Sequence, residues 1–408
     1  MLYAQAFRGS FIHPDELDTL SRASTFTTVP LNFADSKWRS ITAIDQPLLS
    51  YYVYGIAKIL GETIRLGRNQ ECTPNPNTRN YKPLSKYVMP YQFTTPSELS
   101  KPILCMMTPL FSMRLVAVLF SVMTLGIVII IGMFIDNVVT GLLAATLYLT
   151  NPAFLTCMVR AMGDPILIFF MTIHVFLSIL IAMRFFKHTS VAVPILAILS
   201  GIVSGLAMST KLNGALLLIS FWLVIAVLYE KRIIADALQV IVALAISLVT
   251  TFYIFFFLNP YLWTSPLQNF NIMVDYRLKT IAYQSKLSSN PALSTISDRI
   301  SHVIINILLP KGDYTTFHNS ALPFDIVFFC FGLYILIRMA VRSRARGSMA
   351  LLFLVWAFPI ITITTTMLAI DWDRYYLPII LIIKIIQAVG ITHFFSYIFR
   401  LLKPWRRV

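Results

Sequence analysis

The stretch MRLVAVLFSVMTLGIVIIIGMFI, residues 113–135, decides the class of fold. It contains one charged side chain, Arg114, at its second position, and no proline. As a helix rising about 1.5 Å per residue it would be about 34 Å long, enough to cross the roughly 30 Å hydrocarbon core of a bilayer. The stretch therefore predicts a transmembrane helix.

Apolar stretches of similar length recur along the chain. Of its 408 residues, 57% are hydrophobic and 12% are charged, and the mean hydropathy is +0.74, which excludes an ordinary soluble domain. The sequence predicts an all-α polytopic membrane protein with about nine transmembrane helices. These are expected at residues 113–135, 138–158, 165–184, 191–209, 213–229, 238–259, 323–338, 349–370 and 375–397.

The basic residues indicate the orientation of these spans. The net charge is +15, but the basic residues gather in short clusters between apolar stretches, which is typical of cytoplasmic connectors and not of a nucleic-acid-binding surface. Alternation places the clusters YEKR (229–232), RMAVRSRAR (338–346) and RLLKPWRR (400–407) inside. All acidic residues except Asp136, Glu230 and Asp236 then lie on the extracytoplasmic side.

This topology leaves two long extracytoplasmic segments. The stretch PLLSYYVYGIAKIL (47–60) has apolar residues at helical spacing and predicts a helix at the membrane interface. The second segment has helical patterns at 268–287 and 295–309, so it forms either a substrate-binding lid or a solvated connector. We expect four parts. Residues 1–112 form an extracytoplasmic loop with an acidic motif and interfacial helices, and residues 113–259 form transmembrane helices. Residues 260–322 form a second extracytoplasmic loop, and residues 323–408 form the last transmembrane helices and a basic cytoplasmic tail.

Metal and redox sites have little support in the sequence. The four cysteines lack a CxxC spacing, which argues against zinc and redox motifs; a disulfide between Cys72 and Cys105 is left open. The residues Asp371 and Asp373 of DWD resemble a metal-binding DxD, but so short a motif is a weak signal. We expect no cofactor, and a divalent metal is not favoured.

Charged residues gather at the predicted outer ends of the spans. An ionisable group at membrane depth is costly and usually faces a cavity or a partner. The candidate site residues are His13, Asp15 and Glu16 in FIHPDELDTL (11–20), Arg114, Arg160, Asp164, Lys211, Asp373, Arg374 and Tyr375.

This set of residues fits the transfer of a sugar from a lipid-linked phosphate. A carboxylate such as Asp15 or Glu16 can act as a general base, while arginine and lysine bind phosphate. Other interpretations remain open at this point. The acidic pair could be solvated or lie at a helix N-terminus, Arg114 could snorkel, and Arg160 could simply pair with Asp164.

Several motifs carry a resemblance to a known family. They are HPDE (13–16), IDQPLLSYYVYG (44–55), the stretch from 113, TNPAFLTCMVRAMGDPILIFF (150–170), GLAMSTKLNGALLL (205–218), LNPYLW (258–263) and WDRYYLP (372–378). In this order they resemble the GT-C glycosyltransferases, in particular the protein O-mannosyltransferases and the related lipid-carrier-dependent aminoarabinose transferases of lipid A. The resemblance covers nearly the whole chain.

The resemblance implies roles for individual residues. Asp15 is expected to be the general base, with Glu16 beside it positioning the acceptor. Arg114, Lys211, Arg374 and Tyr375 are expected to bind the donor phosphate, and Asp164 to line the same cavity. Asp45 lies in IDQPLL, which has Leu48 where the commoner D-x-P-P pattern has a second proline. It is expected to be either a structural or an acceptor-side residue.

The predicted function is therefore an inverting membrane glycosyltransferase. Its expected partners are a polyprenyl-phosphate sugar donor, membrane lipids and an extracytoplasmic protein, lipid or glycan acceptor, without nucleic acid. The alternatives are a transporter or flippase for lipid-linked or anionic substrates, and a non-catalytic scaffold. The outer loops lack N-x-S/T sequons, which favours a bacterial inner membrane over the endoplasmic reticulum. About a dozen residues precede His13, too few to span, so we expect either that the chain begins outside or that a helix lies upstream.

Overall fold

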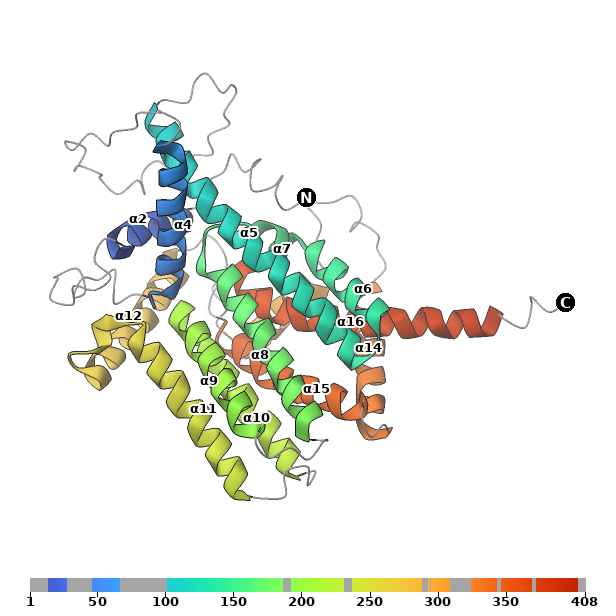
Figure 1. The fold of residues 1–408 in the computed structure, drawn as a ribbon. Coiled ribbons are helices and arrows are strands. Elements are labelled where there is room, and N and C mark those ends of the chain that lie inside the picture. The colour runs from blue at the N-terminus through green and yellow to red at the C-terminus, as the bar shows by residue number, and fades with distance from the viewer. Residues whose placement is uncertain are drawn as a thin grey trace.

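The computed structural model consists of helices packed into one bundle (Figure 1). It describes residues 14–27, 46–66, 101–185, 192–230, 237–287, 293, 295–308, 324–342, 346–368 and 372–402, and no strand occurs among them. The positions of His13, Asp45, Cys72 and Asp371 lie outside these ranges.

Up to residue 257 the described helices are, in chain order, α2 (Pro14–Thr27), α4 (Leu49–Leu66), α5 (Lys101–Ile135), α6 (Val138–Leu149), α7 (Pro152–Cys157), α8 (Gly163–Phe185), α9 (Ala192–Thr210), the short η4 (Leu212–Ala215), α10 (Leu216–Glu230) and α11 (Ala237–Phe257). They are followed by η5 (Pro260–Leu262), α12 (Pro266–Leu287), α13 (Ile296–Val303), η6 (Ile304–Leu308), α14 (Phe324–Arg342), α15 (Arg346–Thr366) and α16 (Asp373–Leu402).

Eight helices in the described part of the chain are long and apolar enough to cross a membrane. They confirm eight of the expected spans, and α4, α12 and α13 confirm the helices expected in the outer segments. The first span differs at its start, because α5 already begins at Lys101. The candidate spans are Pro109–Ile135, Gly163–Leu180, Val193–Thr210, Leu212–Glu230, Ala237–Phe257, Phe324–Val341, Gly347–Thr366 and Arg374–Leu401.

The expected span at 138–158 is wrong as a continuous helix. The chain instead forms α6, which has 12 residues and at about 18 Å is too short to span, followed by the six-residue α7. Asn151 separates the two helices, because its side chain accepts hydrogen bonds from Ala153 N (3.0 Å) and Phe154 N (3.4 Å) as an N-cap. Pro152 follows at the first helical position, where its missing N–H costs nothing.

Helices approach one another closely at glycines. A Cβ atom on Gly332 of α14 would overlap the Ile386 carbonyl of α16, and one on Gly390 would overlap the Phe328 carbonyl. Gly132 and Gly141 bring α5 against α6 in the same manner. Small residues of this kind let membrane helices gain van der Waals contact where burial from water supplies no driving force.

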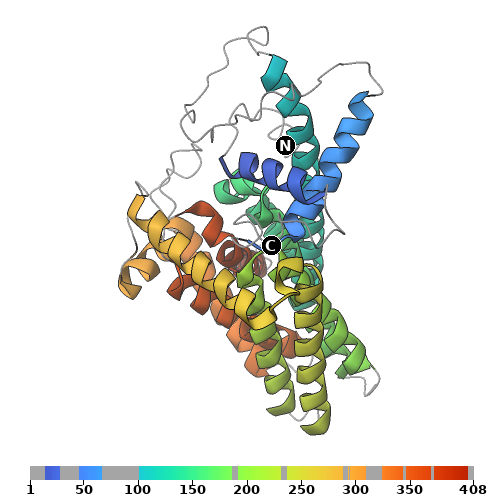
Figure 2. The same cartoon turned by 90° about the vertical axis from the view of Figure 1, so that its left-hand side faces the viewer.

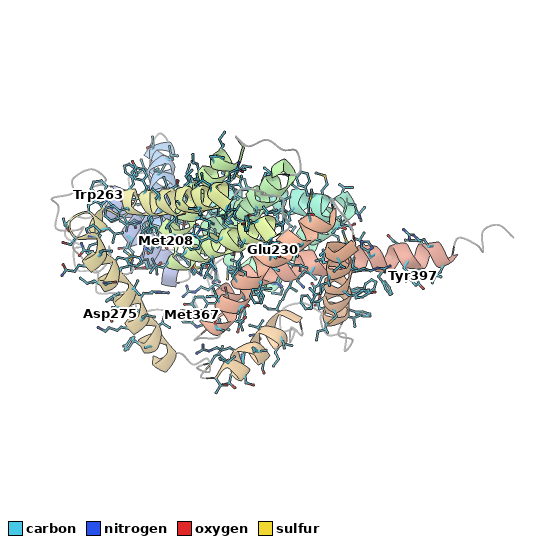
Figure 3. The ribbon with its side chains drawn as sticks, turned by 90° about the horizontal axis from the view of Figure 1, so that it is seen from below. Met208, Glu230, Trp263, Asp275, Met367 and Tyr397 are labelled. Atoms are coloured by element: carbon cyan, nitrogen blue, oxygen red, sulfur yellow. The ribbon has the colours of Figure 1, made fainter. Side chains whose placement is uncertain are left out.

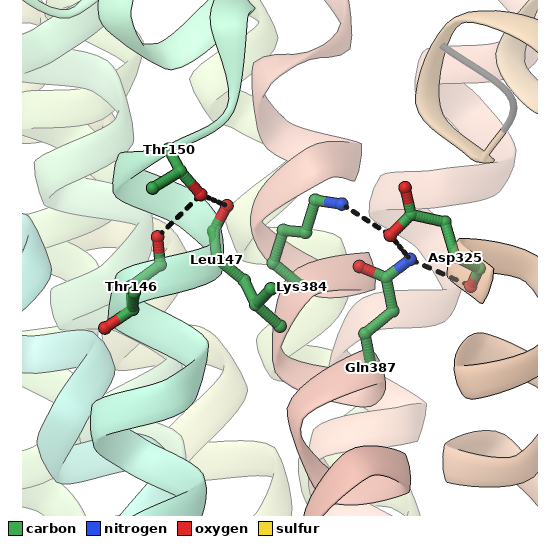
Figure 4. Close-up of polar contacts among 6 residues, drawn as sticks. All are labelled: Thr146, Leu147, Thr150, Asp325, Lys384 and Gln387. Carbon is green, nitrogen blue, oxygen red and sulfur yellow. Dashed lines mark hydrogen bonds and ion pairs between the residues drawn. The ribbon is translucent and has the colours of Figure 1, made fainter. Parts of the chain in front are cut away.

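A partly buried ion pair also joins α14 to α16 (Figure 4). Lys384 Nζ lies 3.3 Å from Asp325 Oδ1, and Gln387 Nε2 donates to the same oxygen at 3.0 Å and to the Asp325 carbonyl at 2.9 Å. Charged groups at this depth need a partner. The pair therefore fixes how α16 lies along α14.

The starts of α5 and α8 and the end of α9 lie toward the same end of the bundle (Figure 1). The helices α2 and α4 stand beside α5, at the end opposite to the end of α10 and the start of α11 (Figure 1; Figure 2). Seen from below, Trp263, just after α11, and Asp275 on α12 lie far from Tyr397 on α16 (Figure 3). The bundle thus places α2 and α4 beside the first part of α5, the start of α8 and the end of α9.

The glycine contact between α14 and α16 is tested by the G332A substitution. The added methyl group should force the two helices apart and lower the free energy of unfolding by about 1–3 kcal/mol, as overpacking does. The matched control is G126A in α5, since nothing lies within 4 Å of a Cβ atom there; alanine should leave stability unchanged or raise it by up to about 1 kcal/mol. Equal thermal stability of the two variants in detergent would contradict the proposed contact.

Candidate functional site

Glu16 and Arg114 form a buried ion pair between α2 and α5. Arg114 donates from Nε to Glu16 Oε1 at 2.8 Å and from Nη2 to Oε2 at 2.6 Å, and the Ala161 N–H donates to Oε1 at 3.0 Å. Glu16 is fully buried and Arg114 is 4% exposed. Such a two-point fork is the strongest common geometry for these groups, so the alternatives of a solvated Glu16 and a snorkelling Arg114 are wrong.

Tyr54 of α4 contacts the turn between α7 and α8, the turn whose Ala161 N–H bonds to Glu16. Its hydroxyl donates to the Met162 carbonyl at 2.6 Å, and its ring is fully buried. Burial, followed by the nearby carboxylates of Asp164 and Glu16, raises the pKa of the Tyr54 phenol well above its ordinary value, against the effect of the hydrogen bond to Met162. Tyr54 is therefore a neutral donor that holds α4 to the turn between α7 and α8.

Asp164 and Lys211 form a second ion pair, between the start of α8 and the residue after α9. Their Oδ1 and Nζ atoms are 2.6 Å apart. Asp164 lies in the first turn of α8, where the helix dipole favours a negative charge. Its Oδ2 atom is buried and has no hydrogen-bond partner among the described residues. The pair thus has one carboxylate oxygen to offer to a ligand.

Close packing at Gly163 brings α4 to this second pair. A Cβ atom there would lie 3.4 Å from Lys211 Cε, 3.6 Å from Thr210 Cγ2 and 3.7 Å from Ser50 Oγ. Ser50 is a residue of the first turn of α4. The start of α4, the start of α8 and the end of α9 therefore meet at Gly163.

Arg160 does not pair with Asp164, although the two residues are four apart. Lys211 holds Asp164 instead, and the residues from Cys157 to Gly163 form a turn between α7 and α8 in which Met162 N donates to the Arg160 carbonyl at 2.8 Å. The spacing of four residues brings side chains together only within a helix, and no helix continues through this turn.

Arg374 lies against aromatic rings at the start of α16. Its guanidinium carbon is 4.4 Å from the centre of the Trp372 ring and 5.4 Å from that of Tyr375, and the two rings stack at 5.6 Å. Next to them, Asn306 Nδ2 donates to the Tyr376 hydroxyl at 3.2 Å. The cation–π contacts orient the guanidinium, and η6 supports the same end of α16.

The structure thus groups the predicted site residues into three sets. Glu16 pairs with Arg114, Asp164 pairs with Lys211, and Arg374 stacks with Tyr375. Asp15 and Asp373 lie at the starts of α2 and α16, but their side chains fall outside the description, as do His13 and Asp45. No group of three or more potential metal ligands occurs within the described ranges.

The sequence interpretation missed Tyr54 and Asn259 as members of this region. Both are polar side chains with almost no exposure, and each bonds to a segment far away in the chain. The signal available was an amphipathic tyrosine in an apolar stretch and an asparagine at the end of a span, just before Pro260. Neither pattern states which partner the side chain will meet.

Residues 82–264 match the family "Dolichyl-phosphate-mannose-protein mannosyltransferase". The fold is similar to the crystal structure of ArnT from Cupriavidus metallidurans in the apo state, with a TM-score of 0.51 and 15% identity over 93% of this chain and 55% of that chain. ArnT bound to undecaprenyl phosphate gives a TM-score of 0.52, 15% identity, and coverage of 93% and 56%. The chain has a GT-C fold.

A weaker similarity is to the archaeal oligosaccharyltransferase AglB from Archaeoglobus fulgidus in complex with an inhibitory peptide and a dolichol-phosphate. It has a TM-score of 0.40 and 13% identity over 74% of this chain and 42% of that chain. A comparison with curated proteins found no match. This GT-C chain spans about half the length of the ArnT structures that it matches.

The Glu16–Arg114 pair is tested by the E16Q substitution. Replacing the carboxylate removes the two-point ionic fork that Glu16 offers to the buried Arg114, so the free energy of unfolding should fall by about 3–5 kcal/mol. The matched control is D18N on the same helix, where Asp18 pairs with Arg22 at 2.8 Å but is 48% exposed; it should cost less than about 1 kcal/mol. Denaturation in detergent measures both variants, and equal losses would contradict a structural role for the pair.

Proposed function

We propose that this protein is an inverting membrane glycosyltransferase that moves a sugar from a polyprenyl-phosphate donor to an extracytoplasmic acceptor. The observation that carries the proposal is the mannosyltransferase family match over 82–264, because this segment contains Arg114, Asp164 and Lys211. The ArnT structure with undecaprenyl phosphate supports a lipid phosphate as the leaving group. The comparisons give no support to a transporter or flippase.

The proposed chemistry is a single displacement at the anomeric carbon. An acceptor hydroxyl or amine attacks this carbon, its proton passes to the Asp15 carboxylate, and the bond from the carbon to the phosphate oxygen breaks. The electron pair of that bond leaves with the polyprenyl phosphate. Asp15 acts as the general base, while Lys211 and Arg374 stabilise the charge that develops on the phosphate.

The geometry of Lys211 supports its part in this proposal. An ammonium group has three donors, and Lys211 uses one on Asp164 while its side chain remains 21% exposed. Two donors can therefore meet a phosphate without losing the partner that orients the lysine. Arg114 differs, since Glu16 occupies its Nε and Nη2 atoms in a buried site; we propose that it acts on the donor through the placement of α2 and α5.

The reaction as proposed needs no cofactor, because Lys211 and Arg374 supply the positive charge. A divalent metal at Asp371 and Asp373 would be revealed by loss of transfer on chelation with EDTA and recovery with added metal. We further propose a bacterial inner membrane as the location, since the outer loops lack sequons. The sugar is proposed to be mannose or another hexose or pentose, and the acceptor a protein, lipid or glycan.

The proposed general base is tested by D15N in the full chain reconstituted in nanodiscs. With a radiolabelled polyprenyl-phosphate sugar, the rate of sugar transfer should fall by about 10²- to 10⁴-fold. The control is D18N, three residues further along α2 and paired with Arg22, which should retain the wild-type rate. Unchanged transfer by D15N would remove Asp15 from the mechanism. Movement of the intact lipid-sugar across the bilayer without its consumption would instead favour a flippase.

The proposed contact of Lys211 with the donor phosphate is tested by K211M. Loss of a charge-assisted hydrogen bond should weaken binding of polyprenyl phosphate by about 10- to 100-fold. Because K211M alone leaves buried Asp164 unpaired, the double variant D164N/K211M separates binding from folding: it should recover stability but not affinity. K279M is the control, since Lys279 is 75% exposed and pairs with Asp275 of its own helix. Wild-type affinity in D164N/K211M would contradict the assignment.

A further inference from the structure

Asn259 is a buried amide that bonds to three separate elements. Its Oδ1 accepts the Leu48 N–H, just before α4, at 3.0 Å. Its Nδ2 donates to the Phe255 carbonyl in the last turn of α11 at 2.6 Å and lies 3.5 Å from Ser209 Oγ, near the end of α9. With an exposed fraction of 1%, Asn259 links the beginning of α4 to the ends of α9 and α11.

The surroundings of Asn259 exclude water. Two of its bonding partners, Leu48 and Phe255, belong to one apolar cluster, which consists of Leu48, Tyr51, Met208, Phe255, Tyr261, Leu262 and Met273. Leu48 and Phe255 in this cluster are 0% and 1% exposed. A peptide group buried in such a cluster cannot turn to solvent if its partner is lost, and an unsatisfied buried group is costly. The Leu48 N–H therefore depends on the Asn259 side chain.

The residues that Asn259 holds lie next to the Asp164–Lys211 pair. Ser209 precedes Lys211 by two positions, and Ser50, two positions after Leu48, lies against Gly163. The Leu48 carbonyl also accepts from Tyr51 N at 3.0 Å and thereby starts α4. One side chain thus sets where the start of α4 stands relative to Lys211.

We propose that Asn259 is a positioning residue for the Asp164–Lys211 pair, acting through its bond to the Leu48 N–H. This inference rests on the proposed function, because it assigns the pair to the lipid phosphate. Asn259 itself touches neither residue of the pair in the described contacts. Its loss should move the Lys211 ammonium relative to the donor, which weakens phosphate binding and slows transfer together.

A substitution at Leu48 can test the Leu48 N–H bond to Asn259 without changing the other hydrogen bonds of the Asn259 amide. Leu48 stands where the commoner motif has a second proline, and a proline has no N–H to donate. The L48P variant therefore deletes the hydrogen bond from the other side while leaving Asn259 in place. It also removes the buried Leu48 side chain, so L48A, which loses that side chain but keeps the N–H, is its reference. If the bond carries the effect, L48P and N259A should be strongly non-additive.

The experiment is a double-mutant cycle of N259A, L48P and the combined variant in the full chain. Polyprenyl-phosphate affinity and transfer rate are both measured per folded protein, with helix content and thermal stability recorded for each. We expect each single variant to lose about tenfold in both quantities, and the double variant to lose little more than either one. A residue with a structural role alone would lower stability but leave the affinity of the folded fraction unchanged.

The matched control for N259A is N269A. N269A removes a similar amide nearby, whose Nδ2 donates to the Tyr261 carbonyl at 2.7 Å and to Thr264 Oγ1 at 3.2 Å; it should retain affinity and rate. Additive losses in the cycle, or a folded N259A with normal affinity, would overturn the inference while the proposed function stands. If N259A does not fold, the comparison of L48P with L48A decides, because the two differ in the Leu48 N–H. A wild-type protein that neither binds nor transfers would overturn the proposed function itself.

Discussion

The buried ion pair of Glu16 and Arg114 joins α2, which precedes the candidate spans in the chain, to the helix bundle. Removing both charges from water costs several kcal/mol for each ion, and only good geometry offsets that cost. The fork from Arg114 supplies two bonds and the Ala161 N–H a third. One carboxylate therefore holds α2, α5 and the turn before α8 together. Asp164 follows Ala161 by three residues, so the position of the Asp164–Lys211 pair depends on the Glu16–Arg114 pair.

Close helix contacts extend this placement through the bundle. A Cβ atom on Gly201 or Gly205 of α9 would overlap groups of α11 around Ser247 and Thr251, and the Thr251 hydroxyl lies 3.2 Å from the Gly201 carbonyl. Where backbones touch in this way, a helix cannot slide without a steric clash. The ends of α9 and α11, which carry Lys211 and Asn259 just beyond them, are consequently fixed relative to each other.

The proposed site is built from residues that neutralise one another before any ligand binds. Asp164 faces Lys211 at 2.6 Å, and Arg374 rests on the Trp372 ring. Pairing of this kind keeps a cation oriented at membrane depth, where an unpaired charge would be costly. A phosphate would therefore meet donors that are already directed, which is the condition for electrostatic stabilisation without reorganisation at the moment of reaction.

Most of the fold follows from the length of the apolar stretches. Eight spans, the helix at 49–66 and the helices after η5 were predictable, because hydropathy and spacing report what one helix does in a bilayer. The break at Asn151 was not predicted. It depends on a side-chain cap and on Pro152, two local features that the apolar character of 138–158 conceals.

The sequence by itself determined the class of fold and pointed to Arg114, Asp164 and Lys211 as charged residues near the ends of apolar stretches. It did not determine their partners. Local spacing paired Asp164 with Arg160, whereas the structure pairs it with Lys211, 47 positions away, and gives Arg114 to Glu16, 98 positions away. Only the tertiary structure decided these pairings, because they depend on which helix ends meet, and that is set by the packing of backbones at glycines and by buried amides such as Asn259.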